Sequence, residues 1–145
     1  MVFTLEWSLR RDDMMRVFIS QPMHGLSNEE ILQRREELIR LLHKWFQPEP
    51  IEVIDSYTKP ENIVNGGRIV MLGHSIQMLS QADAVLFARG WSDSPGCIVE
   101  HTVCEQYKIK TLYEDNIPIH LKEDLDFYNY MNQYMPINED TQYWR

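Results

Sequence analysis

The chain has 145 residues, of which 43% are hydrophobic and 25% are charged, and its formal net charge is −8 at pH 7. This length and composition predict a single globular domain with its own core. The acidic balance argues against general binding to nucleic acid or to a membrane surface, because proteins that bind those polyanions carry an excess of Lys and Arg. We therefore expect no nucleic-acid partner and no membrane partner.

The ends of the chain and its cysteines indicate a cytoplasmic location. Residues 1–14 lack the apolar core of a signal peptide. We interpret them as an N-terminal arm, followed by a single α/β domain at 15–135 and a polar tail at 136–145. No apolar run approaches the ~20 residues of a membrane span. Cys97 and Cys104 would lie about two turns apart on one helix, too far for a disulfide. Such thiols favour a reducing compartment, which is the cytoplasm, or that of a host cell if a phage encodes the chain.

In chain order, a strand at 16–20 comes first, because that run is β-branched and aromatic. Ser27 then caps a helix that ends before Pro48, and Glu30 completes a capping box. A strand at 51–54, a helix at 67–81 and a strand at 83–88 follow. A helix at 101–108, a strand at 109–113 and a last helix at 121–134 complete the predicted elements.

Strands that alternate with helices are typical of βαβ units and a parallel sheet. Because the crossovers in such units are right-handed, helices cover both faces of the sheet. We therefore predict a three-layer α/β fold, with a mostly parallel sheet of four to five strands and helices on both faces, as in flavodoxin-like and Rossmann-like domains.

The most informative segment is 94–100, Ser-Pro-Gly-Cys-Ile-Val-Glu, which follows the strand at 83–88. In an open α/β sheet, ligands bind at the carboxyl ends of the strands, and the free N–H groups of a helix start attract anions. Gly96 lets a ligand approach the backbone, and the hydroxyl of Ser94 is able to bind a phosphate oxygen. The segment predicts an anion site, with Glu100 in the first turn of the helix that follows.

Several residues of this region have a structural interpretation beside the functional one. Ser94 and Gly96 also fit an ordinary Ser-Pro-Gly turn. Asp93 fits either a contact with a sugar hydroxyl or a simple loop carboxylate. Trp91 fits either a wall for a base or sugar, or partly buried packing. The residue types alone leave these alternatives open.

Glu100 also has two interpretations. It heads a helical stripe with Val103, Cys104 and Tyr107. Such an apolar stripe would desolvate the carboxyl group and raise its pKa. The alternative is a solvated position at the rim, where the carboxylate complements the helix dipole.

The loop after the first strand supplies a second half of the predicted site. The first and third strands of a parallel sheet are able to be neighbours, so that their loops face one crevice. Four residues of the first loop would then point toward Ser94 and Glu100: Ser20, Gln21, His24 and Gly25. His24 is able to donate to a phosphate, although a surface loop histidine is the alternative.

Neither metal nor cofactor is expected. Cys97, Glu100, His101 and Cys104 lie close on one predicted helix, but the pairs one turn apart point in different directions. A zinc site needs three or four convergent ligands. The sequence also contains no Walker lysine motif and no G-x-G-x-x-G fingerprint. We therefore predict no metal and no cofactor.

Three segments resemble the nucleoside 2-deoxyribosyltransferase-like superfamily. Segment 18–25, Phe-Ile-Ser-Gln-Pro-Met-His-Gly, resembles its first-strand loop, and segment 79–87 looks like the entry to its third strand. Segment 90–101, with Gly-Trp followed by Ser-x-Gly-x-x-x-Glu-His, is similar to its catalytic signature. The resemblance covers about residues 15–113 and is closest to small phage and bacterial members, nearer the nucleoside-monophosphate N-glycosidase branch.

The resemblance implies an enzyme that cleaves or transfers at the N-glycosidic bond of a nucleotide. The family's nucleophilic glutamate, which forms a glycosyl ester, matches Glu100. Ser94 stands where nucleoside transferases carry an aspartate and monophosphate hydrolases a serine, so the resemblance implies a 5′-phosphate on the substrate. His24 falls near an arginine that the hydrolases use for phosphate. Family members form homodimers or larger homo-oligomers, and we expect the same here.

Two departures from the family pattern concern turnover. Ser75 stands where the family carries an aspartate that handles the leaving base, and Phe18 stands where many members have a tyrosine. Protonation of the base would then need His74, Asp93, Asp55 or a neighbouring subunit. The alternative hypothesis is a non-catalytic protein on the same fold that binds or sequesters a nucleotide.

Overall fold

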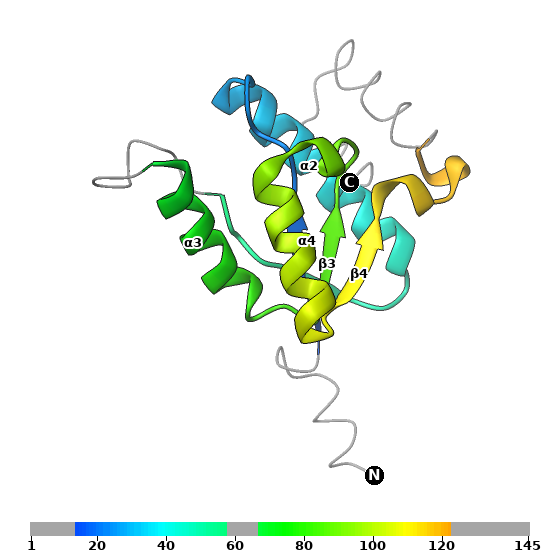
Figure 1. The fold of residues 1–145 in the computed structure, drawn as a ribbon. Helices are drawn as coiled ribbons and strands as arrows, with labels where there is room; N and C mark the ends of the chain where they lie inside the picture. The colour runs from blue at the N-terminus through cyan, green and yellow to red at the C-terminus, as the bar shows by residue number, and fades with distance from the viewer. Residues whose placement is uncertain (1–13, 58–66, 123–145) are drawn as a thin grey trace.

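A computed structural model describes residues 14–57 and 67–122 of the chain, and these form an α/β fold around a four-stranded parallel sheet (Figure 1). The strands are β1 (Met15–Ser20), β2 (Ile51–Val53), β3 (Ala84–Phe87) and β4 (Lys110–Tyr113). Their order in the sheet is β2-β1-β3-β4, and each neighbouring pair is parallel. The predicted fold class is therefore confirmed.

Helices cover both faces of the sheet. In Figure 1, α4 (Pro95–Tyr107) lies in front of the sheet with α3 (Arg68–Leu79) to its left, whereas α2 (Asn28–Phe46) lies behind. The connection from β1 to β2 runs in the opposite direction across the sheet from the connection of β3 to β4, so right-handed crossovers place α2 and α4 on opposite faces. Within the described ranges, no helix is both long and apolar enough to cross a bilayer.

Side chains of β1 point alternately to the two faces of the sheet and pack into a hydrophobic cluster on each. Val17 and Ile19 pack with Leu38 and Leu42 of α2, whereas Phe18 packs with the cluster under α3 and α4. β3 is buried along its whole length. Because both faces of the central strands are apolar, the sheet is fixed in register, and the loops at its carboxyl edge are held on a rigid frame.

Most predicted elements of the described residues are confirmed with small changes at their ends. The capping box of α2 is present: Ser27 Oγ accepts from the N–H of Glu30 at 3.1 Å, and Glu30 Oε1 accepts from the N–H of Ser27 at 3.3 Å. The N-terminal arm up to residue 13, nearly all of the helix predicted at 121–134 and the tail at 136–145 lie outside the described residues.

The predicted start of the helix after β3 was wrong. We expected a helix at 101–108, but α4 begins at Pro95, with Ser94 as its N-cap residue. Proline suits this first position, because its fixed φ angle fits a helix and its missing N–H would have no intrahelical partner there. Glu100 therefore lies in the second turn, not in the first turn as predicted.

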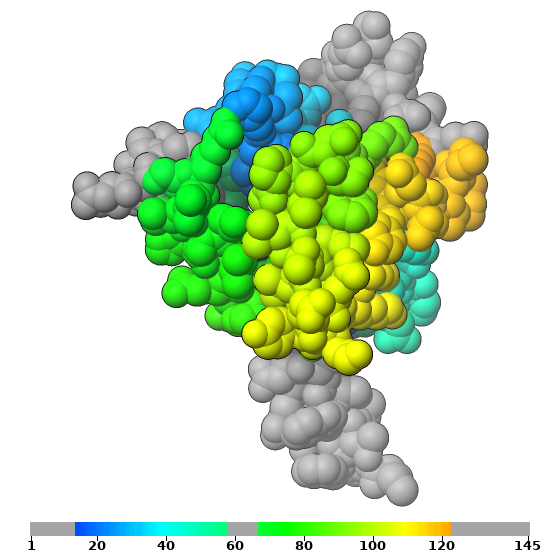
Figure 2. All heavy atoms as spheres, viewed as in Figure 1, coloured from blue at the N-terminus to red at the C-terminus, as the bar shows by residue number. Residues whose placement is uncertain are grey.

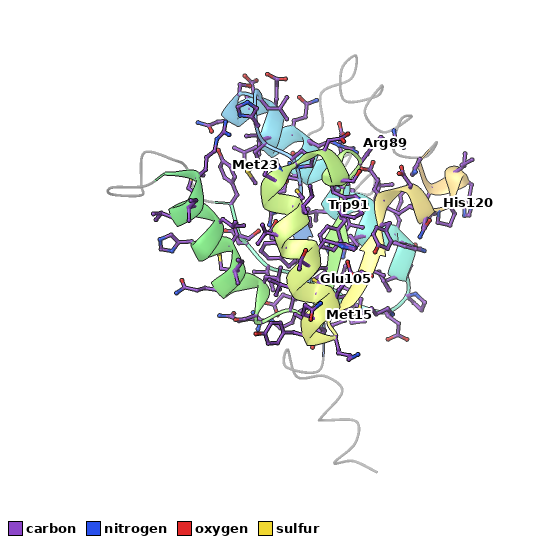
Figure 3. All side chains as sticks on the ribbon, in the orientation of Figure 1. Met15, Met23, Arg89, Trp91, Glu105 and His120 are labelled. Atoms are coloured by element: carbon purple, nitrogen blue, oxygen red, sulfur yellow. The ribbon has the colours of Figure 1, made fainter. Side chains whose placement is uncertain are left out.

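The direction of the connections changes between β1 and β3, which are neighbours in the sheet. At such a switch point the loops after the two strands separate, and residues of both loops line a cavity on the α2 side of the sheet. The N–H of Ala88 donates to the carbonyl of Ser20 at 2.9 Å and extends the pairing to the edge. Figure 3 shows Met15 at the opposite end of the molecule from Met23 and Arg89, which lie in the two loops.

Candidate active site

The centre of the site is a contact between Ser20 and Glu100. Ser20 is the last residue of β1, and its side chain lies on the same face of the sheet as Phe18, toward α4. Its Oγ donates to Oε1 of Glu100 at 2.8 Å, and the glutamate side chain is only 6% exposed. The hydrogen bond joins two residues 80 positions apart in the sequence at the switch point of the sheet.

A stripe of small residues and one carboxyl group anchors α4 to the sheet. Cys97, Glu100 and Cys104 are buried at spacings of three and four residues. The predicted stripe included Tyr107, which is wrong, since this residue is 77% exposed. The stripe begins one turn earlier than predicted, because the helix itself begins earlier.

Burial raises the pKa of Glu100 to about 7, and the hydrogen bond from Ser20 opposes this by stabilising the carboxylate. The desolvated interpretation of Glu100 is thus confirmed and the solvated-rim interpretation is wrong. Burial, followed by the charge of Glu100, raises the pKa of the Cys104 thiol to about 11. A carboxyl group with a pKa near neutrality is able to hold or release a proton under physiological conditions.

The start of α4 has backbone N–H groups that its own helix does not satisfy. Within the described residues, the Ser94 side chain makes no capping hydrogen bond. The first intrahelical bond runs from the N–H of Ile98 to the carbonyl of Ser94 at 2.9 Å, so the N–H groups of Gly96 and Cys97 have no intrahelical acceptor. A helix start of this kind attracts anions.

Cys97 lies between the two hydroxyl groups of the site. Burial raises the pKa of its thiol, and hydrogen bonding with Ser20 and Ser94 opposes that shift. Gly96 faces α3, where a Cβ atom at its position would lie 4.0 Å from Leu72 Cδ1. Figure 2 shows α3 and α4 side by side on this face, so the start of α3 lies beside the start of α4.

His24 meets a residue that the sequence analysis missed. His24 is exposed in the β1–α2 loop, next to Gly25 with its left-handed φ of +82°. The guanidinium group of Arg68, the first residue of α3, contacts its Nδ1 and lies 3.4 Å from its Nε2. A signal for Arg68 was present: a cation in the first turn opposes the helix dipole, so its presence there favours a role other than helix stability.

Gln21 does not lie beside Glu100. Because side chains alternate along an extended chain, Gln21 points to the face opposite Ser20, and its Nε2 donates to the carbonyl of Ile31 in α2 at 3.2 Å. Asp55 is exposed after β2, close enough to the buried Arg35 to oppose the lowering of the Arg35 pKa that burial causes. The structure brings neither Gln21 nor Asp55 to the start of α4.

Trp91 belongs to an aromatic cluster on the β4 side of α4 (Figure 3). Its ring stacks on His101 with centroids 4.2 Å apart and packs against Phe87 at 5.3 Å. The Nε2 of His101 lies 2.8 Å from the hydroxyl of Tyr113, and its Nδ1 lies 2.7 Å from Glu105. The indole of Trp91 therefore packs partly buried in this cluster.

The remaining predicted residues are not among the contacts around Ser20 and Glu100. Asp93 is exposed at the end of the short helix η3 (Trp91–Asp93). His74 is exposed and Ser75 is half-buried on α3. Ser75 follows Leu72 by three residues and precedes the buried Leu79 by four, which places it on the inner stripe of the helix.

The described residues contain no group of three or more His, Cys, Asp and Glu side chains placed to hold a metal ion. Comparison of the chain with protein-family models, with curated proteins and with solved structures gives no match. The geometry of the site and the sequence motifs are therefore the indications of function.

Proposed function

We propose that the chain cleaves the N-glycosidic bond of a nucleoside 5′-monophosphate, or transfers its (deoxy)ribosyl group, with Glu100 as the nucleophile. The observation that carries this proposal is the buried carboxyl group of Glu100 at the switch point, held by Ser20 at 2.8 Å. Carboxyl groups in apolar surroundings serve as acids, bases and nucleophiles in glycosyl transfer. The resemblance of segment 90–101 to the nucleoside 2-deoxyribosyltransferase-like superfamily supports the substrate class.

The proposed reaction has two displacements. The Glu100 oxygen that Ser20 does not hold attacks the anomeric carbon, the bond from this carbon to the base nitrogen breaks, and its electron pair goes to the base, which takes up a proton. A glycosyl ester on Glu100 results. Water or a second base then attacks the same carbon and releases the carboxylate, so configuration is retained. Ser20 acts as a positioning residue, because it fixes the rotation of the carboxyl group.

The proton for the leaving base is assigned to solvent, which reaches the exposed groups near the start of α4. Asp93 directly precedes the N-cap residue of α4, and it is exposed to solvent. His74 is also exposed, on the adjacent helix α3. We take Asp93 as the residue that handles the sugar hydroxyl or the base, with solvent as the proton source.

The start of α4 and the start of α3 support a 5′-phosphate on the substrate. Within the described chain the Ser94 side chain caps no backbone N–H and hydrogen-bonds with the Cys97 thiol, and the N–H groups of Gly96 and Cys97 have no intrahelical acceptor. Arg68 and His24 add a guanidinium and an imidazole, the donors that bind phosphate oxygens well. An aspartate at the position of Ser94 would repel the phosphate.

Free base released from deoxynucleoside and ribonucleoside monophosphates tests the proposal directly. We expect one or more of these nucleotides to yield base, and Glu100→Gln to abolish the release. Glu105→Gln is the matched control, because it removes a glutamate of the same helix that is exposed and pairs with His101. Intact-protein mass spectrometry should detect a sugar-phosphate adduct on the wild-type chain only. Absence of base release from every nucleotide would overturn the enzymatic proposal.

A second candidate function is nucleotide binding without turnover. The half-buried Ser75 on the inner stripe of α3 favours it, because the superfamily that the sequence resembles carries a supporting acid there. This function predicts nucleotide affinity that Glu100→Gln largely retains and no release of base. A glycosyl adduct on Glu100 would exclude it.

We further propose that the chain forms a homo-oligomer through the face in Figure 2. Ile69 and Val70 near the start of α3 and Ile98 and Val99 near the start of α4 are exposed. The two helices lie side by side on this face, and exposed apolar groups favour association. Light scattering after size-exclusion chromatography should show a dimer or larger species. Ile98→Glu should shift it to the monomer, whereas Leu32→Glu on α2 should not. A wild-type monomer at every concentration would contradict this proposal.

A further inference from the structure

Helix α4 carries a second group of hydrogen-bonded side chains beside Glu100. His101 follows Glu100 directly, and consecutive residues of a helix point about 100° apart. Glu100 reaches Ser20 of β1, whereas Nε2 of His101 lies 2.8 Å from the hydroxyl of Tyr113 at the end of β4. A carboxylate oxygen of Glu105 lies 2.7 Å from Nδ1 of the same imidazole. We call these three residues the Tyr113 triad: Glu105, His101 and Tyr113.

The Tyr113 triad is separate from the Glu100 site. The strand registers place Ser20, Phe87 and Tyr113 in one row across the sheet. Neighbouring strands lie about 4.8 Å apart, so the backbone of Tyr113 is roughly 10 Å from that of Ser20. Phe87 occupies the middle of the row and separates the two sites. What happens at Tyr113 is therefore independent of the proposed glycosyl chemistry.

The partners of His101 decide which of its nitrogens carries a hydrogen. The carboxylate of Glu105 only accepts hydrogen bonds, so Nδ1 is the donor. The neutral imidazole then has its lone pair on Nε2, which accepts from the hydroxyl of Tyr113. A hydroxyl that donates to a base, which a third group orients, is the arrangement of an activated nucleophile, and both distances fit its range of about 2.6–3.2 Å.

The rings around His101 suit it to take up a proton. The imidazole stacks on Trp91 with centroids 4.2 Å apart and meets the ring of Phe87 at 4.8 Å. When Nε2 takes the proton of Tyr113, the face of the indole and the carboxylate of Glu105 stabilise the imidazolium. The side chain of His101 is only 14% exposed, so solvent screens these interactions weakly.

The surroundings of the Tyr113 triad favour an uncharged substrate. Trp91 offers an aromatic surface beside the imidazole, and Glu105 is an exposed carboxylate. The net charge of the chain is −8, so its field repels anions. An aryl ester has a flat, apolar leaving group that suits the indole, and it carries no charge.

We propose that Tyr113 is a nucleophile with His101 as its general base, and that it accepts acyl groups from uncharged aryl esters. Oη of Tyr113 attacks the acyl carbon while its proton passes to Nε2 of His101. The bond from this carbon to the aryl oxygen breaks, and the released phenolate takes the proton from His101. Water then attacks the acyl carbon and gives a proton to His101, and Tyr113 regains this proton as the carboxylic acid leaves.

Labelling of the full-length chain with an aryl sulfonyl fluoride tests the nucleophile. Oη bonds to the sulfur, fluoride leaves, the proton passes to the base, and the ester that forms is stable. Peptide mass spectrometry locates the label among the seven tyrosines. We expect the half-buried Tyr113 to be labelled roughly tenfold or more faster than Tyr107, which is 77% exposed on α4. Labelling governed by exposure alone would give the reverse order.

Two variants test the base. His101→Gln keeps a hydrogen-bonding side chain that does not take up the proton, so labelling of Tyr113 should slow roughly a hundredfold. Release of 4-nitrophenolate from 4-nitrophenyl acetate should fall in this variant to the level of Tyr113→Phe. Tyr107→Phe is the control and should leave the release unchanged. Circular dichroism checks that each variant folds.

The pH dependence of labelling in the wild type tests the same base without a variant. Glu105 of α4 and Tyr113 of β4 are the titratable groups that contact the imidazole, whereas Phe87 of β3 and Trp91 of η3 carry none. The rate at Tyr113 should rise until the imidazole is neutral and then level off by about pH 8. An unassisted phenol reacts as the phenolate, so its rate rises toward the ordinary tyrosine pKa of about 10.

Three results would overturn the proposal: labelling of Tyr107 at least as fast as that of Tyr113, unchanged labelling in a folded His101→Gln, or a rate that rises to pH 10 without a plateau. If His101→Gln does not fold, the labelling order and the pH profile of the wild type decide. No nucleotide enters these experiments, so their failure would leave the proposed function intact, and absence of base release would leave this proposal intact.

Discussion

The starts of α2 and α4 lie at the same edge of the sheet, and their chemistry differs. At α2, Ser27 and Glu30 satisfy each other's backbone N–H groups in a capping box. At α4, the side chain of the N-cap residue Ser94 makes no such bond in the described structure, and the carboxyl group of Glu100 is buried behind it. The backbone N–H groups at the start of α2 are capped by side chains of the same segment. At the start of α4 the Ser94 side chain caps none within the described residues, so N–H groups there are able to donate to a ligand. The same residue type, serine, thus closes the helix start at Ser27 and leaves it without a side-chain cap at Ser94 in the described structure, where we propose that it serves recognition.

The largest expected effect is on substrate recognition. Ser94→Asp should raise the KM for a nucleoside monophosphate roughly a thousandfold, because a carboxylate beside the 5′-phosphate costs several kcal/mol. Ser27→Asp should leave KM unchanged, since Asp caps a helix as well as Ser does. Steady-state kinetics on both variants checks the contrast. Equal KM values for Ser94→Asp and the wild type would place the phosphate elsewhere.

The next effect is on stability, and it depends on pH. Between about pH 4.5 and 7 the native chain binds a proton at Glu100 that the unfolded chain has released, because its pKa is raised from 4.5 to about 7. The free energy of unfolding of the wild type therefore falls as pH rises through this window. Glu100→Gln removes the buried charge, and it should stabilise the fold by about 3 kcal/mol at pH 8 and by little at pH 4.

Urea denaturation at the two pH values measures this difference. Glu105→Gln on the exposed side of the same helix is the control, and it should show no comparable gain at pH 8. A Glu100→Gln variant that is less stable than the wild type at pH 8 would contradict the raised pKa. The expected gain also means that the native glutamate lowers stability, which is common where a residue serves function.

A smaller effect distinguishes the two serine N-caps. Ser27→Ala should lower the free energy of unfolding by about 1 kcal/mol, because the N–H of Glu30 loses its acceptor. Ser94→Ala should cost less than half as much, since its hydroxyl caps nothing in the described structure. Chemical denaturation of both variants gives the values. Equal losses would show that Ser94 also serves as a structural cap.

How far the sequence predicts this structure depends on the range of the interactions involved. The capping box of α2 and the apolar runs of the strands are local patterns, and they were predicted correctly. The start of α4 was missed, because Ser94-Pro95-Gly96 has the composition of a turn. Packing of Cys97 and Glu100 against the sheet extends the helix over it.

In the candidate site, too, local patterns were predicted and most long-range contacts were not. We expected from the sequence that the loop after the first strand faces the segment after the third, and Ser20 does meet Glu100 there. The expectation was wrong for Gln21, because side chains alternate along an extended chain and this one points to α2. The cation in the first turn of α3 was a local signal for Arg68, but its partner His24 lies 44 positions away, and no local pattern identifies that contact. The Oε1 of Gln21, which is buried without a hydrogen-bond partner in the described chain, likewise depends on how α2 packs, which only the structure reveals.

The smallest expected effect sharpens the role of Ser20. Activity that needs the Glu100 carboxylate should rise with pH through about 7, the pKa of this group in the free protein, when kcat/KM is measured. The hydrogen bond from Ser20 stabilises the carboxylate, so Ser20→Ala should move the midpoint of this profile to higher pH. Ser20→Cys, which keeps a weak donor, should lie between the two. A side chain that only fills space would leave the midpoint where it is, so an unshifted profile in Ser20→Ala would show that Ser20 does not hold the nucleophile.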